Sequence, residues 1–120
     1  MENRIRVVII EPGKLARITE IDDSLSSMQS TVEGYIQVIS ASAIPGGKVL
    51  NKELKNLILV LNEEGKIDKL PFNFKIYDGA DYIAGTCFIC KEKEEEMVGL
   101  SQEEAELVAA SFDRKENANG

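Results

Sequence analysis

Two short runs of almost continuous apolar residues set the strongest limit on how this chain can fold. They are "IRVVII" at residues 5–10 and "NLILVLN" at residues 56–62. Runs of this length, rich in β-branched side chains, are typical of strands covered on both faces. Both are much shorter than the ~20 apolar residues of a membrane span. In a chain of 120 residues they predict one globular domain around a single core.

An N-terminal hairpin is predicted around the first run. The alternating stretch "LARITEI" favours a second strand, so we expect strands near residues 4–11 and 15–21. Between them, Pro12 and Gly13 suit the two central positions of a type II turn.

A first helix is predicted after the hairpin. Asp22 or Asp23 is expected to cap its start, and Gly34 to end it in a left-handed conformation. The apolar residues at helical spacing between them are Leu25, Met28 and Val32. The stretch "YIQVIS" at residues 35–40 then predicts a strand. Residues 41–55 contain Pro and Gly and predict a loop, with a short turn of helix as an option.

The C-terminal third predicts one more strand and one more helix. "TCFICKEK" at residues 86–93 is the last clear strand, and the acidic stretch at residues 92–100 is expected to be a mobile connection. Ser101 and Glu104 have the spacing of a capping box at the start of a helix. The expected inward stripe of this helix is Ala105, Val108, Ala109 and Phe112.

Together these elements predict an α+β fold. We expect a mixed or mostly antiparallel sheet of about five strands with two flanking helices, in a single domain at residues 1–113. Residues 114–120, "RKENANG", are expected to be a flexible polar tail.

The polar stretch "LNEEGKIDKLP" at residues 61–71 is either a site or a turn. Asn62 and Gly65 suit the start and the left-handed position of a hairpin corner, with "KID" as a short returning strand. This places Glu63 and Glu64 at an exposed tip. A phosphate site is disfavoured because adjacent glutamates repel an anion. The apolar residues of the following Leu70-Pro71-Phe72 segment are expected to be tucked into the core.

Composition excludes several classes of function. The net charge is −7, which is unfavourable for a nucleic-acid binder because phosphates are neutralised by a surplus of Lys and Arg. The chain has no histidine, so Ser-His or Cys-His nucleophiles and a conventional zinc site are ruled out. We expect no cofactor and no metal. The N-terminus lacks the features of a signal peptide, which predicts a cytoplasmic protein with no membrane association.

Cys87 and Cys90 have the spacing of a redox or zinc motif. Redox pairs of this kind begin a helix, whereas these two cysteines lie in a run of strand formers. Positions three apart in a strand point to opposite faces, so the thiols are not expected to meet. We favour buried structural cysteines.

Asp78, Asp81 and Tyr82 crowd the predicted turn "YDGADYIAG". Paired carboxylates can bind a divalent cation or transfer protons. The spacing is not that of a metal loop, however, and turn formation alone explains Asp78-Gly79. We favour the turn, with a partner contact or catalysis as the alternatives.

An acidic cluster follows the last predicted strand. Its members are Glu92, Glu94, Glu95 and Glu96. The simpler interpretation is a solvated sheet edge whose charges prevent pairing with other chains. The functional alternative is a patch that imitates nucleic-acid phosphates and occupies a basic groove on a partner.

Four short motifs occur in a recognisable order: "GYI", "NEEGK", "LPFN" and "IAGT". The matching residues are Gly34, Tyr35, Ile36, Asn62, Glu63, Glu64, Gly65, Lys66, Leu70, Pro71, Asn73, Ile83, Gly85 and Thr86. Over about residues 4–91 the chain resembles a small family of uncharacterised proteins from phages, plasmids and conjugative elements of Firmicutes-type bacteria. The resemblance supplies no catalytic residue, and the acidic stretch from Lys91 onward departs from its pattern.

The resemblance implies a role on a mobile element, where small acidic proteins often inhibit host defence. Our leading hypothesis is a non-enzymatic anti-defence protein, of anti-CRISPR or antirestriction type, that binds a host CRISPR effector or restriction nuclease. The partner-binding residues would be Glu63, Glu64, Asp78, Asp81, Tyr82, Glu92, Glu94, Glu95 and Glu96. The alternatives are a protein that binds a nucleotide or metabolite between residues 70–85 and a neighbouring subunit and, third, an enzyme using Asp78, Asp81 or Tyr82. A homodimer with a shared sheet is a further option.

Overall fold

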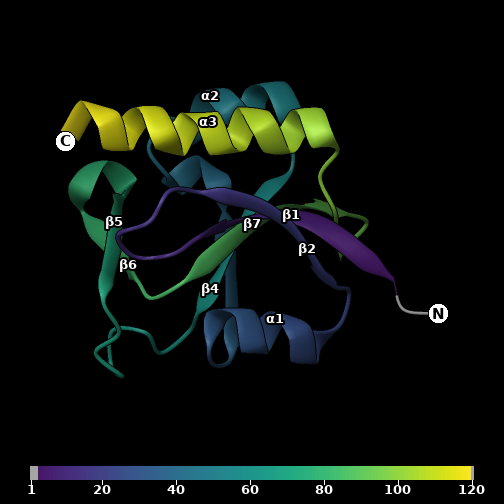
Figure 1. The fold of residues 1–120 in the computed structure, drawn as a ribbon, viewed down its shortest axis with the longest axis horizontal. Helices are drawn as coiled ribbons and strands as arrows, with labels where there is room; N and C mark the ends of the chain where they lie inside the picture. The colour runs from purple at the N-terminus through teal and green to yellow at the C-terminus, as the bar shows by residue number, and fades with distance from the viewer. Residues whose placement is uncertain (1–2, 120) are drawn as a thin grey trace.

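The computed structural model describes the backbone of residues 3–119 and the side chains of residues 3–112 (Figure 1). Its strands are β1 (Arg4–Ile10), β2 (Arg17–Asp22), β3 (Ile36–Ser40), β4 (Leu57–Asn62), β5 (Phe72–Ile76), β6 (Asp81–Ala84), β7 (Cys87–Lys93) and β8 (Glu96–Val98). Its helices are α1 (Leu25–Val32), α2 (Gly47–Leu54) and α3 (Gln102–Asn119), with short 3₁₀ turns η1 (Ala41–Ala43) and η2 (Tyr77–Gly79).

A six-stranded sheet forms the centre of the molecule. Its strand order is β2-β1-β7-β4-β3, and β8 extends it by pairing with β7. β5 and β6 form a separate two-stranded sheet, and every described strand pair is antiparallel. The predicted α+β fold with a mostly antiparallel sheet is confirmed. It has one more helix and more strands than expected, because the loop predicted with an optional turn of helix contains α2, and because β5, β6 and β8 were not predicted.

Helices cover both faces of the sheet. α2 and α3 lie on one face and α1 on the other (Figure 1). Val8 of β1 belongs to the same apolar cluster as Val108 of α3, whereas Phe88 of β7 clusters with Met28 of α1. The two apolar runs predicted to be strands buried on both faces are confirmed as β1 and β4, and β7 lies between them.

The N-terminal hairpin is also confirmed. β1 and β2 pair from Arg4 opposite Asp22 to Ile9 opposite Arg17. The turn that joins them has Gly13 at a φ of 73°, as a type II turn requires.

The two ends of α1 differ from the prediction. Asp22 is the last residue of β2, and Ser24 caps the helix instead, accepting a hydrogen bond of 3.1 Å from the Ser27 N–H. The left-handed residue at the end is Glu33, with a φ of 63°, and not Gly34. The start was misplaced because Asp22, Asp23 and Ser24 are all residue types that cap helices. The end was misplaced because glycine is the usual left-handed residue there, whereas the structure has Glu33 in that conformation.

Asn62, at the end of β4, is a buried polar residue that joins three segments. Its amide Nδ2 donates to the carbonyls of Val32 and Glu33 at 3.1 and 3.2 Å, and its Oδ1 accepts from the Glu64 N–H at 2.7 Å. A Cβ on Gly34 would lie 2.6 Å from that Nδ2. Gly34 is therefore required for space beside Asn62 and not for a left-handed turn.

The returning strand predicted at residues 66–68 is wrong. Residues 63–69 form consecutive turns, and Leu70 donates its N–H to the Gly65 carbonyl at 2.9 Å. No strand can return along β4 here, because β3 and β7 already occupy both of its edges. Gly65 does not have a positive φ; its missing Cβ would lie 2.5 Å from the Ala84 carbonyl oxygen.

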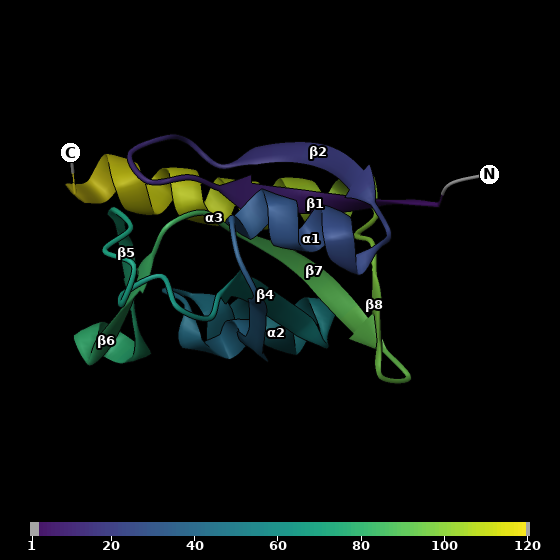
Figure 2. The same ribbon diagram turned by 90° about the horizontal axis from the view of Figure 1, so that it is seen from below.

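The stretch predicted to be a mobile acidic connection contains an ordered hairpin. β8 returns along β7, with Lys91 opposite Val98 and Lys93 opposite Glu96, at one end of the long axis (Figure 2). Met97 explains the strand, because it packs against the apolar cluster on the α1 face. One apolar pair within a run of charges was too weak a signal to predict it.

The last helix begins as expected. Glu104 donates its N–H to Ser101 Oγ at 3.1 Å, and its Oε1 accepts from the Ser101 N–H at 2.9 Å, which completes the capping box. Ala105, Val108 and Ala109 are buried as expected. Of the predicted flexible tail at residues 114–120, the backbone of residues 114–119 continues α3, whereas Gly120 and the side chains beyond residue 112 lie outside the described part of the chain. Within the described residues, no helix is long and apolar enough to cross a membrane.

The contact between Gly34 and Asn62 can be tested by a double-mutant cycle. Gly34→Ala and Asn62→Ala should each lower the free energy of unfolding by about 1–3 kcal/mol, because each removes or displaces buried hydrogen bonds. In the Asn62→Ala background, Gly34→Ala should cost much less, since the group that it collides with is gone. Urea denaturation measures all three variants, and Glu63→Ala is the exposed control. Equal costs in both backgrounds would contradict the contact.

Candidate functional site

The residues predicted for a site fall on three surfaces. The hairpin of β7 and β8 carries Glu92, Glu94, Glu95 and Glu96. A hollow beside the turns after β4 is lined by Glu63, Asp81 and Tyr82, with Glu64 in the adjoining turn. Asp78 lines a third surface, a larger groove. The structure thus brings together only subsets of the predicted residues.

The four glutamates of the β7–β8 hairpin, hereafter the hairpin carboxylates, are all exposed. Among the described side chains, none of them takes part in an ion pair. The base of the hairpin is fixed, because Lys91 pairs with Glu104 of α3 at 2.7 Å. Burial raises the pKa of Glu104, but hydrogen bonds from Lys91 and Ser101 outweigh it and leave this pKa below its usual value. The hairpin therefore presents negative charge from an anchored base.

The tip of the hairpin has an unfavourable backbone for its residues. Glu94 and Glu95 have φ values of 52° and 66°, and they form the two-residue loop between Lys93 and Glu96. Loops of this type prefer Asn-Gly, because each residue is left-handed. For other residues the conformation costs roughly 1–2 kcal/mol each. The two glutamates thus occupy turn positions at which their side chains lower the stability of the turn.

The hollow beside the β4 turns has a volume of about 350 Å³ and is arranged around Lys66. Lys66 forms an ion pair with Asp81, and its Nζ lies 4.7 Å from the centre of the Tyr82 ring. The hydrogen bond from Lys66, followed by one from the Tyr82 N–H, lowers the pKa of the Asp81 carboxyl. Asp81 is therefore an ionised, paired carboxylate, which is a poor starting point for a general base.

Phe72 contradicts the expectation that the residues of the Leu70-Pro71-Phe72 segment are tucked into the core. It is 55% exposed, and its ring packs against Tyr82 with the ring centres 5.7 Å apart. The small β5–β6 sheet thus shows aromatic side chains to solvent.

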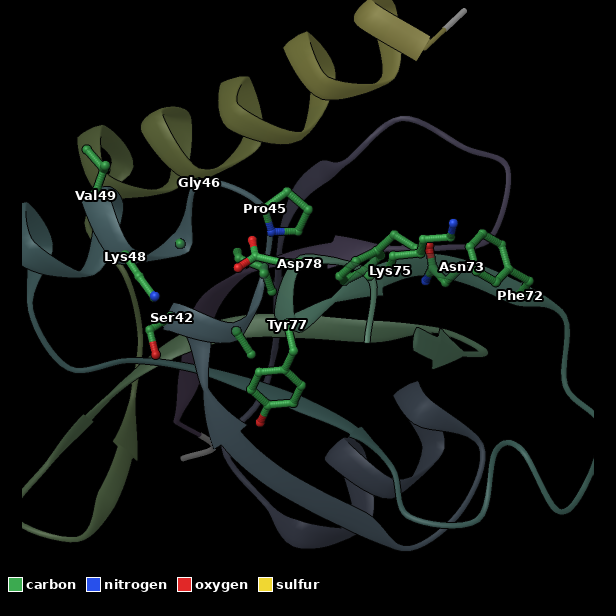
Figure 3. A pocket seen from close by; sticks show the side chains of 15 residues that line it. Ser42, Pro45, Gly46, Lys48, Val49, Phe72, Asn73, Lys75, Tyr77 and Asp78 are labelled. Atoms are coloured by element: carbon green, nitrogen blue, oxygen red, sulfur yellow. The ribbon is translucent and has the colours of Figure 1, made fainter. Parts of the chain in front are cut away.

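The third surface is a groove that the sequence did not predict (Figure 3). It has a volume of about 890 Å³ and lies between η1 and the start of α2 on one side and β5 and η2 on the other. Its polar and charged lining residues are Ser42, Lys48, Asn73, Lys75, Tyr77 and Asp78. These segments are distant in the sequence, so no single stretch predicts the groove. The only local indication was the Pro45-Gly46-Gly47-Lys48 stretch, which forms part of one wall.

Backbone strain marks the opposite wall of this groove. Tyr77 and Asp78 have φ values of 51° and 55°, which is uncommon for any residue with a side chain and most of all for an aromatic one. Tyr77 lines both the groove and the hollow around Lys66. Strained residues of this kind concentrate at functional sites.

Cys87 and Cys90 are both buried and unpaired. They belong to the apolar clusters on opposite faces of the sheet, which confirms that the thiols do not meet. Burial raises the pKa of Cys87, and burial with the negative charges of Asp23 and Glu92 raises the pKa of Cys90 to about 12. Neither thiol is a nucleophile in this environment.

Comparison with known proteins places the chain in a family. The family model described as "Domain of unknown function (DUF3846)" matches residues 5–113. The chain belongs to this family. A comparison with curated proteins gave no match, and a comparison with solved structures gave none. The DUF3846 match spans the β7–β8 hairpin, the hollow and the groove, so all three surfaces belong to the family domain.

The inertness of the cysteines is testable by thiol labelling. In the folded protein, neither Cys87 nor Cys90 should react with a thiol reagent at about pH 8, because both are buried and protonated. Both should react in denaturant, which serves as the control. Rapid labelling of the folded protein, measured by mass spectrometry, would contradict the structural role.

Proposed function

We propose that this DUF3846 protein is a non-catalytic inhibitor that binds a basic groove of a host nucleic-acid-processing protein through the hairpin carboxylates. In this proposal it acts in the bacterial cytoplasm as a mobile-element anti-defence protein, and the partner is a CRISPR effector or a restriction nuclease. The observation that carries the proposal is the Glu94-Glu95 pair, held in left-handed conformations at an exposed tip. A solvated edge needs charge, but it does not need charge at these two positions.

Electrostatics explain why such a tip suits a nucleic-acid-binding groove. Residues 92–96 contain four glutamates and one lysine. A groove that binds phosphates is lined by Lys and Arg, so it attracts a ribbon of carboxylates by the same Coulomb force. The Lys91–Glu104 ion pair fixes the base of the ribbon to α3, which reduces the entropy lost on binding.

A binding role also agrees with the side chains available for chemistry. The chain has no histidine, and among the described residues no group of three or more Cys, Asp or Glu side chains is arranged to hold a metal ion. Asp81 is paired with Lys66, and both cysteines are buried.

Two hairpin variants separate the charge of the tip from its shape. Glu94→Asn with Glu95→Gly should stabilise the protein by about 1–2 kcal/mol, since the preferred turn residues replace strained ones. It should also weaken inhibition, because two carboxylates are lost. The matched variant Glu94→Asp with Glu95→Asp keeps the charge and should keep the inhibition.

The measurement is stoichiometric inhibition of a panel of purified nucleases that includes Cas effectors, at low and high salt. Inhibition should weaken as salt rises, because the interacting charges are exposed. The proposal fails if no nuclease on the panel is inhibited, or if the Asn-Gly variant inhibits as well as the wild type.

A second candidate function is the binding of a small anionic ligand, such as a nucleotide, in the groove. It is favoured by one observation: the fold brings Lys48 and Lys75 into the lining of one groove of about 890 Å³, beside the strained Tyr77. The groove is large enough for a nucleotide-sized ligand.

A thermal-shift screen tests this candidate. A nucleotide that binds should raise the melting temperature with a dependence on ln(1 + [L]/Kd). Lys75→Ala should abolish the shift, whereas Lys52→Ala, on α2 but outside the groove, should leave it unchanged. No shift with any nucleoside mono-, di- or triphosphate or cyclic dinucleotide would rule the candidate out.

A further inference from the structure

The two ends of the main sheet path differ in charge. β2 carries Arg17, Glu20 and Asp22, whereas β3, with the sequence IQVIS, has no charged residue. The other described strands at sheet edges, β5, β6 and β8, each carry at least one charge. Charged residues, prolines and bulges are the usual means by which an edge strand avoids pairing with another chain. β3 has a regular register from Ile36 to Ser40 and has none of them.

The register of β3 shows which backbone groups face outward. Glu63 donates its N–H to the Tyr35 carbonyl at 2.8 Å, so Tyr35 and the alternate residues Gln37 and Ile39 bond to the β4 side. The N–H and C=O groups of Ile36 and Val38, and the N–H of Ser40, therefore point away from the sheet. Within the described residues, β3 has no strand partner other than β4.

Exposed apolar side chains lie along the same edge. Val38 is 40% exposed on β3. Gln37 and Ile39 line the hollow around Lys66 together with Tyr77 and Tyr82, which are 53% and 39% exposed. An outward row of backbone donors and acceptors that is flanked by apolar side chains is the surface used for strand addition.

We propose that this edge pairs with β3 of a second copy of the chain, antiparallel and centred on Val38. In this register Val38 faces Val38 of the other copy, and Ile36 faces Ser40. All three positions present outward groups, so the two strands exchange hydrogen bonds reciprocally. A second copy fits better than a charged peptide because the strand has no charge that would select one. It also fits because no like charges face each other where the two strands meet, in a protein of net charge −7.

Disulfide trapping tests the register. Facing residues of a hydrogen-bonded antiparallel pair have Cα atoms about 5.5 Å apart, which is within disulfide range. Val38→Cys should therefore give a covalent dimer under mild oxidation. Gln37→Cys is the matched control: it would face Ile39, so it should not link to itself. The native cysteines are buried and should not contribute.

Charge at the edge tests the interface. Analytical ultracentrifugation of the wild type, over the micromolar range, should show a dimer. Val38→Lys should raise the dissociation constant by about tenfold or more, because like charges then face each other. Thr19→Lys, the same change on the β2 edge, should leave it unchanged, and circular dichroism shows whether each variant is folded.

Three results would overturn the proposal. They are a wild type that stays monomeric, a dimer that folded Val38→Lys does not weaken, and equal cross-linking of Val38→Cys and Gln37→Cys. None of these measurements depends on the hairpin carboxylates, so the pairing can fail or succeed independently of the proposed inhibitor function.

Discussion

The insertion of β7 between β1 and β4 is the interaction on which the rest of the structure depends. Phe88 and Ile89 of β7 are fully buried, and each contacts a different apolar cluster, so this strand unites the two halves of the core. β7 comes late in the chain, and its pairing with β1 closes a long loop at a cost in chain entropy. Without β7, β1 and β4 would not belong to one sheet, and α1, α2 and α3 would have no continuous sheet to cover. The Lys91–Glu104 ion pair then links β7 to α3 and fixes the base of the acidic hairpin.

The sequence predicted elements whose causes are local and missed those whose causes are tertiary. Pro12-Gly13 and the Ser101–Glu104 capping box act within a few residues, and both were predicted correctly. Gly34 and Gly65 were assigned to turns from their type alone. In the structure they leave space for Asn62 and for the Ala84 carbonyl, which lie on other segments. The returning strand at residues 66–68 failed for a similar reason, because no local pattern shows that both edges of β4 are occupied.

The candidate sites follow the same division. An acidic cluster can be proposed from composition, and its four glutamates lie on one hairpin, although the hairpin itself was not predicted. The groove could not be predicted from the sequence. Its walls come from residues 42–49 and 72–79, which are too far apart in the chain to form a local pattern. Asp81 was predicted as a possible partner-binding or catalytic carboxylate, but in the structure Lys66 holds it in an ion pair beside Tyr82. Site residues could be predicted where one segment of the chain forms the whole surface. They could not be predicted where two distant segments form it together.

Charge is distributed so that the proposed interactions do not compete. The hairpin carboxylates gather negative charge at one end of the long axis, whereas β3 is neutral along its whole length. Attraction between the hairpin and a basic groove weakens as salt rises, because exposed charges are screened beyond about 10 Å at 0.1 M ionic strength. Pairing of two β3 strands brings together two chains of charge −7 each. Salt weakens their overall repulsion while the backbone hydrogen bonds remain, so pairing at β3 is favoured by the same change that disfavours binding at the hairpin. Opposite responses to salt follow from placing the charged and the neutral surfaces on different strands of one sheet.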